Sequence, residues 1–302
     1  MKLSTLALIG WGIHSDQFVD SAAFVQAVKS ASNGTGGSTG YQTDSNTPQV
    51  NAAFDSAMQG LDAISQHAFR ALNDALQHAG ATPMSQLMDN TALVMLSTWG
   101  PMDNTVAFLD SMLEADGRYT SPRHFTRSVY SSVASHAAIY FGIHGACETL
   151  AHGEWPICAV LDRAADILTA GRFDQVIVCW ADQRSAIATD LCRRGVIGLG
   201  RKEFVRFTGS EIGYGAVAMV LKRAEDNANT MLTVGASEHA VASAKPDLGF
   251  CNLNIHAYPT DGAIELLAAV ITATSKPDHG GIYYTELSTR HRMRKVLITR
   301  ND

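Results

Sequence analysis

The chain has 302 residues, 46% of them hydrophobic, and a formal net charge of -6. This length allows one large buried core or two packed halves, and the acidic balance argues against nucleic acid or an anionic membrane as the main partner. No apolar run approaches the roughly 20 residues of a membrane span, and the N-terminal MKLSTLALIGWG is too short for a secretory signal.

The five cysteines are odd in number and form no C-x-x-C pair. This pattern favours reduced thiols over a disulfide framework or a zinc site. We therefore expect a cytoplasmic protein without a metal centre.

The first third of the sequence alternates between predicted strands and helices. We expect a buried strand at Leu6–Gly12 that runs into a glycine-containing turn. Residues 30–49 are rich in Gly, Ser, Thr and Asn, which predicts a flexible surface loop. Apolar residues at helical spacing predict a helix at Leu61–Ala79, and a buried strand at Thr91–Ser97 and a helix at Thr105–Leu113 follow.

The central segment predicts a loop that feeds a helix over His124–Tyr140, and then a second helix followed by a strand. Pro156 suits the first position of that second helix, because proline lacks an N–H that would have no partner there. Apolar residues recur along one face of it, and Gly171 is suited to end it. The apolar run Gln175–Trp180 then predicts a strand buried in the sheet.

The last third predicts further strands and one more helix. Ser210–Lys222 is either a strand pair or one long strand, and Met231–Val234 is another strand. Gly262–Ala273 is largely apolar, which predicts a helix buried nearly all round. Gly281–Thr285 and Arg294–Arg300 predict a hairpin, so the whole chain is expected to fold as α/β with helices on both faces of its sheet.

Glu154 stands just before Pro156, where a helix N-terminus offers free N–H groups and the positive end of its dipole. A residue at this position is either a helix cap or part of a site. The residues around it must decide between the two.

Several stretches in this order resemble the β-ketoacyl synthases: LDAISQHAFRALNDALQHAG, SPRHFTRSVYSSVASHAAIYFGIHG and AYPTDGAIELLAAVITA. The resemblance implies a thiolase-like fold with two mixed-sheet halves, buried helices and a shortened second half. It also implies one domain over residues 1–302, with an N-terminal ketosynthase-like half at 1–228 and a truncated C-terminal half at 229–302.

The catalytic residues of that family are largely missing from this chain. Its nucleophilic cysteine falls on Glu154, and a carboxylate cannot form the acyl thioester. No HGTGT segment is found, Cys251 takes the lysine position, and His256 matches a retained histidine. The glycine-rich gate is replaced by residues 288–294, so the resemblance implies no catalytic residue.

The relatives with a lost nucleophile and a shortened second half are the chain length factors of type II polyketide synthases, and this chain resembles those of aryl-polyene-type pigment clusters. The resemblance implies a heterodimer with an active β-ketoacyl synthase and transient contact with an acyl carrier protein. It implies no cofactor beyond the phosphopantetheine-borne acyl chain. Residues 102–113 would help to shape the acyl tunnel.

Alternatives remain open at the level of sequence. The chain could be a stand-alone acyl-transferring or thioester-hydrolysing enzyme that uses Cys147 or Cys158, or a homodimeric scaffold. Glu154 could be a cap or a catalytic carboxylate, and His256 a structural residue or a base. The basic stretches 193–206 and 290–295 could be solvated surface, or could bind the phosphopantetheine arm or the acidic carrier protein.

Overall fold

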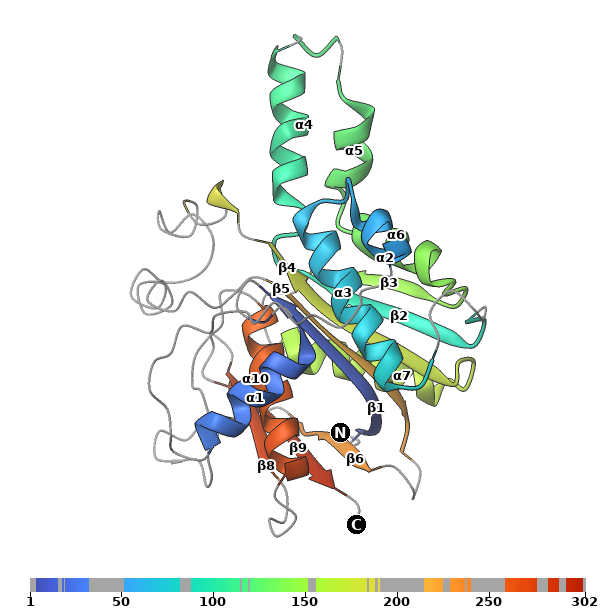
Figure 1. Cartoon of the computed structure of the whole chain (residues 1–302), viewed down its shortest axis with the longest axis vertical. Helices are drawn as coiled ribbons and strands as arrows, with labels where there is room; N and C mark the ends of the chain where they lie inside the picture. Colours follow the sequence, from blue (N-terminus) through green and yellow to red (C-terminus); the bar gives the residue numbers. More distant parts are fainter. Residues whose placement is uncertain are drawn as a thin grey trace.

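The computed structural model describes residues 4–15, 18, 20–32, 52–81, 88–114, 116–118, 120–151, 156–183, 185–187, 190, 215–224, 229–236, 238–239, 259–275, 282–287 and 292–300 (Figure 1). Of the predicted loop at 30–49, residues 30–32 close helix α1 (Ser21–Ser32), and the others lie outside these ranges.

A first group of strands confirms most of the strands predicted from apolar runs. Its order is β3-β2-β4-β5-β1, with β2 parallel to β3 and β4, and with β5 antiparallel to β4 and β1. The bounds are β1 Ser4–Ser15, β2 Thr91–Leu96, β3 Cys147–Leu150, β4 Gln175–Asp182 and β5 Gly215–Arg223.

A second, antiparallel group of strands continues from β1. Residues 4–7 of β1 pair with β6 (Thr230–Val234), and β6 pairs with β9 (Arg292–Arg300). β9 also pairs with β7 (Glu238–His239) and with β8 (Ile282–Leu287). The β8–β9 pair is the predicted hairpin, and the mixed pairing expected of both halves is found among the described strands of the first group.

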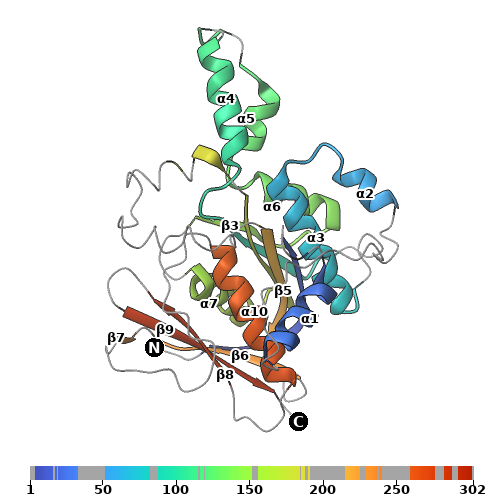
Figure 2. The same ribbon diagram turned by 60° about the vertical axis from the view of Figure 1, so that its left-hand side comes forward.

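Helices cover the first strand group on both faces (Figures 1 and 2). One face packs against α2 (Ala52–Met58), α3 (Ala63–His78) and α6 (Ser132–Phe141). The other face packs against α7 (Pro156–Thr169) and α10 (Pro259–Ser275). α7 and α10 also contact strands of the second group, so this pair of helices forms a layer between the two groups.

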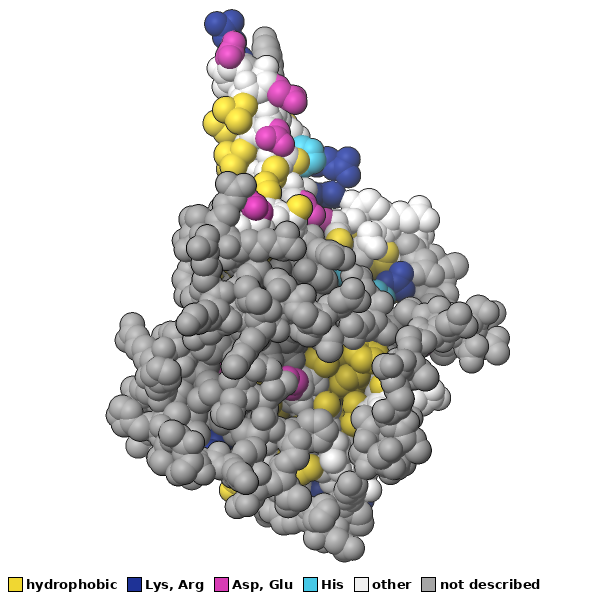
Figure 3. Space-filling model, turned by 90° about the vertical axis from the view of Figure 1, so that its left-hand side faces the viewer, with side chains coloured by type: hydrophobic (Ala, Val, Ile, Leu, Met, Phe, Trp, Pro, Cys, Tyr) yellow, Lys and Arg dark blue, Asp and Glu magenta, His cyan; other side chains and the backbone are white. Residues whose placement is uncertain are grey.

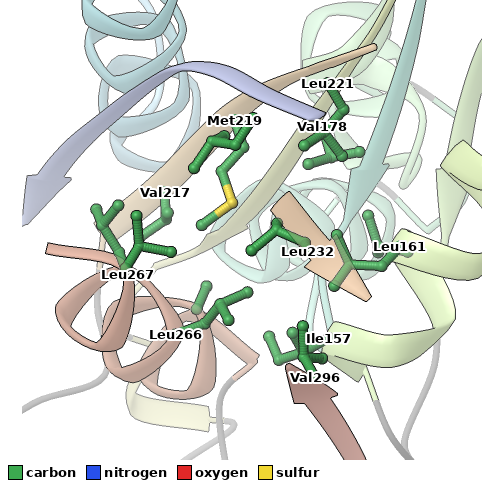
Figure 4. Packing of buried hydrophobic residues seen from close by; sticks show 14 of the residues in the cluster. Ile157, Leu161, Val178, Val217, Met219, Leu221, Leu232, Leu266, Leu267 and Val296 are labelled. Carbon is green, nitrogen blue, oxygen red and sulfur yellow. The ribbon is translucent and has the colours of Figure 1, made fainter. Parts of the chain in front are cut away.

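The packing around α7 and α10 joins strands that are far apart in the sequence. Figure 4 shows Ile157 and Leu161 of α7 and Leu266 of α10 beside side chains of β4, β5, β6 and β9. All of these side chains are nearly or fully excluded from solvent. The buried, apolar character predicted for both helices is therefore confirmed.

The turn predicted near Gly10 and Gly12 is wrong, because β1 continues through both residues to Ser15. A Cβ atom on Gly12 would lie 2.2 Å from the carbonyl oxygen of Ala71, and one on Gly10 would lie 2.4 Å from that of Ala75. The two glycines thus let α3 pack directly on the backbone of β1.

Helices α4 (Met102–Glu114) and α5 (Pro122–Ser128) project together from the body of the molecule, and we call residues 102–128 the arm (Figures 1 and 2). α5 lies where the sequence predicted a loop; Ser121 caps its N-terminus by accepting a hydrogen bond from the His124 N–H. No residue described in either helix is buried. The described side chains of α4 are therefore at most partly covered.

No helix among the described residues is long and apolar enough to cross a membrane.

Candidate functional site

The N-terminus of α7 holds a buried carboxylate. Pro156 has no N–H, so Ile157 and Cys158 provide the first two donors of the helix. Both donate to Glu286: Ile157 N to Oε1 at 3.0 Å and Cys158 N to Oε2 at 3.0 Å. The Trp180 indole N–H donates to the Pro156 carbonyl at 3.3 Å, which fixes the first turn against β4.

The alternation of β8 brings Glu286 to this position. Ile282, Tyr284 and Glu286 are buried on one side of the strand, whereas Tyr283 is exposed on the other. Glu286 lies directly opposite Arg294 of β9. The strand pattern therefore places a charged residue at an inward position that would ordinarily be apolar.

Arg294 joins the same hairpin to α7 at a second point. Its Nη1 and Nη2 donate to the two carboxylate oxygens of Asp162 at 2.6 and 3.0 Å, and its Nε and Nη2 donate to the Gly235 carbonyl. The Arg294 residue is 6% exposed. The hairpin is thus bound both at the first turn of α7 and near Asp162, one turn further along.

The thiols near this helix differ in accessibility and ionisation. Cys158 is fully buried, and burial together with the negative charge of Glu286 raises the pKa of its thiol well above the usual value. Cys147 is exposed on the edge strand β3, and its pKa is raised by partial burial and by Glu148. Neither environment favours a thiolate nucleophile.

Most of the predicted site residues lie outside the described ranges. These are Glu154, Cys251 and His256, together with the basic stretch 193–206. Within the other basic stretch, Arg294 is buried and paired rather than solvated. In the described part of the chain, no three His, Cys, Asp or Glu side chains gather closely enough to hold a metal ion.

Glu286 and Arg294 are the site residues that the sequence analysis missed. The available signal was an alternating strand, Ile282-Tyr-Tyr-Thr-Glu286, in which every second residue points inward. A glutamate in phase with the inward residues predicts a buried acceptor. The pattern alone does not identify the donors. Ile157, one of the two, lies 129 positions earlier in the sequence.

A second buried carboxylate, Asp182, holds the base of the arm. It accepts hydrogen bonds from Ser97 Oγ at 2.8 Å and from the Thr98 N–H at 3.1 Å. The Tyr130 hydroxyl donates to the Thr98 carbonyl at 2.9 Å. The end of β4 therefore fixes the direction in which the chain enters α4.

The fold defined by these strand groups and central helices is that of the ketosynthases and chain length factors, thiolase-like as the sequence predicted. No protein-family model and no curated protein matches the chain.

Three solved structures illustrate the similarity. The ishigamide ketosynthase/chain length factor has a TM-score of 0.68 at 13% identity, and the match covers 99% of this chain and 100% of the matched chain. The ketosynthase ApeO in complex with its chain length factor ApeC, from Xenorhabdus doucetiae, gives 0.60 at 14% identity, over 97% and 99%. The AntDE:AntF complex of a ketosynthase with its type II acyl-carrier protein gives 0.68 at 12% identity, over 99% and 100%.

Proposed function

We propose that this protein is a catalytically silent, chain-length-factor-like subunit that pairs with an active β-ketoacyl synthase in polyketide chain elongation. The shared fold supports the proposal, since one similar structure is a ketosynthase in complex with its chain length factor. An aryl-polyene-type pathway is the version of this proposal that the sequence favours.

The observation that carries the proposal is the state of the α7 N-terminus. In a ketosynthase-like fold this helix end is expected to support the nucleophile, where free N–H groups would stabilise a thiolate. Here two of those N–H groups bind Glu286, and burial together with the Glu286 charge raises the pKa of the nearby Cys158 thiol. This arrangement favours a subunit without acyl-transfer chemistry of its own.

The arm is the surface that we assign to the partner. Leu109, Leu113 and Phe125 are 50%, 78% and 54% exposed, and Figure 3 shows hydrophobic side chains along one edge of the arm. Large apolar side chains exposed in a group are typical of protein interfaces. On this proposal α4 forms a tunnel wall only when it is packed against the ketosynthase.

Strand β3 provides a second contact, because it ends the sheet as a parallel edge beside β2. An edge strand can accept a strand from another chain. Ile139 on the adjacent helix α6 is 80% exposed and would be covered in the same interface.

A carrier protein would meet the arginines of the arm, which lie beside the acidic residues Asp110, Glu114 and Asp116 of the same segment. Arg118 and Arg123 are exposed there, and Arg127 donates to the Gly60 carbonyl at 2.8 Å. On this proposal Arg118 and Arg123 would pair with acidic groups of a carrier protein, which would bring its phosphopantetheine-borne acyl chain. The proposal assigns no cofactor to this chain itself, and it places the chain in the cytoplasm on the basis of its cysteine pattern.

The test is co-expression with a type II β-ketoacyl synthase from the same genome, followed by size exclusion with mass detection. An acylation assay read by intact mass then compares the two chains. A one-to-one complex with acyl groups only on the ketosynthase supports the proposal. Acylation of this chain at Cys147 or Cys158 would instead establish it as an acyl-transferring enzyme.

A further inference from the structure

We propose that Asp62 is a positioning residue for the arm: one oxygen of its carboxylate caps α3 and the other holds α4, so that the free chain presents the arm in one orientation. The role of Asp62 in orienting the arm is argued from contacts within the chain alone. Its consequence for binding rests on the proposed function, in which the arm contacts the ketosynthase.

The arm has little apolar packing that could fix its direction. No residue described in α4 or α5 is buried. Phe108 and Phe125 pack against each other, with ring centroids 5.3 Å apart, and neither belongs to the hydrophobic core. Asp182 holds the residues just before α4. The orientation of the two helices themselves therefore depends on polar contacts at the base of the arm.

Asp62 makes two of these polar contacts. Its Oδ1 accepts the Ser65 N–H at 2.9 Å, which is the N-cap bond of α3. Its Oδ2 accepts the side-chain amide of Asn104 at 2.7 Å, which ties the first turn of α4 to the start of α3. A carboxylate is a stronger acceptor than a neutral carbonyl. In Figure 1 the arm rises from the end of the body at which α3 begins.

The same connection extends to the second helix of the arm. Nδ1 of His124 in α5 lies 3.3 Å from Oδ1 of Asn104. Arg127, also in α5, donates from Nη1 to the Gly60 carbonyl at 2.8 Å. Both helices of the arm are therefore bound to residues 60–62, the segment that leads into α3.

Helix α3 is a firm support for this connection. Eight of its 16 residues are buried. Its backbone lies directly against Gly10 and Gly12 of β1. If the cap of α3 is kept, loss of the bond to Asn104 should therefore release the arm and leave α3 in place.

Replacing Asp62 with serine separates the two roles of the carboxylate. Serine is as good an N-cap as aspartate, so D62S keeps an acceptor for the Ser65 N–H. Its single, shorter hydroxyl cannot also reach Asn104. N104A is the complementary variant, because it removes the donor on the arm, leaves the cap intact and serves if D62S does not fold. D110S, which changes an exposed aspartate further along α4, is the matched control.

The first measurement is hydrogen exchange by mass spectrometry on the purified full chain. In D62S and N104A, the amides of residues 102–128 should exchange about tenfold faster, since a hydrogen bond to a charged group shifts an opening equilibrium by about that factor. The first turn of α3 should keep its wild-type rate, and so should the arm in D110S. D62S/N104A should exchange no faster than either single variant, because both remove the same bond.

The second measurement is the kinetics of binding to the co-expressed ketosynthase. If the released arm has the binding orientation for about a tenth of the time, the apparent dissociation constant rises about tenfold. This loss should lie in the association rate, because the bound arm makes the same contacts as before. Substitution of a residue that contacts the partner acts mainly on dissociation instead.

The two measurements fail in different ways. Unchanged exchange of the arm in both D62S and N104A, equal acceleration of the arm and α3, or a further increase in the double variant would each overturn the proposal. Faster dissociation with unchanged exchange would also overturn it, because Asp62 and Asn104 would then be contact residues. If the wild-type chain binds no ketosynthase, the proposed function fails, and hydrogen exchange still decides the role of Asp62.

Discussion

Arg294 is expected to contribute more to stability than Asp162, although the two form one ion pair. Replacing Arg294 with methionine keeps much of its volume but removes the cation that faces both Asp162 and the buried Glu286. Breaking a buried pair by removing one partner costs about 3–5 kcal/mol. We expect the free energy of unfolding to fall by an amount in this range.

Replacing Asp162 with asparagine should cost less. The Asp162 side chain is 41% exposed, so its charge is already partly solvated. Without it, Arg294 still donates to the Gly235 carbonyl and still faces Glu286. We expect a loss of about 1–2 kcal/mol.

Urea unfolding of the purified chain at pH 7, followed by circular dichroism and tryptophan fluorescence, measures both values. The R294M/D162N double variant completes the cycle, and its cost should be close to that of R294M alone. If R294M costs no more than D162N, compensation of Glu286 by Arg294 is not what stabilises the hairpin, and the reasoning fails.

Three further predictions concern other parts of the molecule. Gly12→Ala should reduce the free energy of unfolding by at least about 2 kcal/mol, because the added Cβ meets the backbone of α3, and urea unfolding measures the loss. Burial, followed by the charge of His67, lowers the pKa of His14 from 6.5 to about 3. The unfolded chain therefore binds a proton that the folded chain rejects, so the melting temperature should fall as the pH drops below about 6.5, and less steeply in H14N. The double variant L109S/L113S should weaken binding to the co-expressed ketosynthase by about tenfold or more without lowering the melting temperature of the free chain, because both side chains are exposed.

Each of these has a control and an excluding result. For Gly12, the control is G235A, whose Cβ would lie 3.1 Å from the Lys295 carbonyl oxygen. If G12A and G235A lower the free energy of unfolding equally, α3 moves aside for the added methyl group and the reasoning is wrong. For His14, parallel pH profiles of wild type and H14N would remove it as the source of acid sensitivity. For the arm, D110S on the same helix should bind normally, and unchanged binding by L109S/L113S would place the partner elsewhere.

The elements that local patterns specify were predictable from the sequence. Pro156, the apolar face after it and Gly171 define α7, which ends two residues before that glycine with Gly171 at φ +72°. The apolar helix at Pro259–Ser275 and the β8–β9 hairpin follow from the same kind of signal. Each is set by propensity and periodicity within about 20 residues.

What could not be predicted depends on distant partners. Nothing near Gly10 and Gly12 in the sequence reveals that α3 packs on them, so the glycines suggested a turn. The hydrogen bonds between Glu286 and α7 join residues more than 120 positions apart. The basic residues around Arg294 were interpreted from the sequence as exposed, whereas Arg294 is buried. The direction of the arm depends on Asp182, which binds Ser97 and Thr98 just before α4 but lies about 70 residues after that helix in the sequence.

The position of β1 in the sheet has a consequence for synthesis of the protein. Among the described strands, β1 is synthesised about 200 residues before its partner β5, since Ser15 pairs with Gly215, and Ala7 pairs with Met231 of β6. At about 5–20 residues per second, translation delivers β5 roughly 10–40 s after β1. Until then this apolar strand has neither of its native strand partners, although α3 is already available to pack on it, so nascent chains should be clients of chaperones that hold unfolded segments. Because such non-local pairing also slows folding in general, the rate at which β1 enters the sheet should limit the yield of native protein.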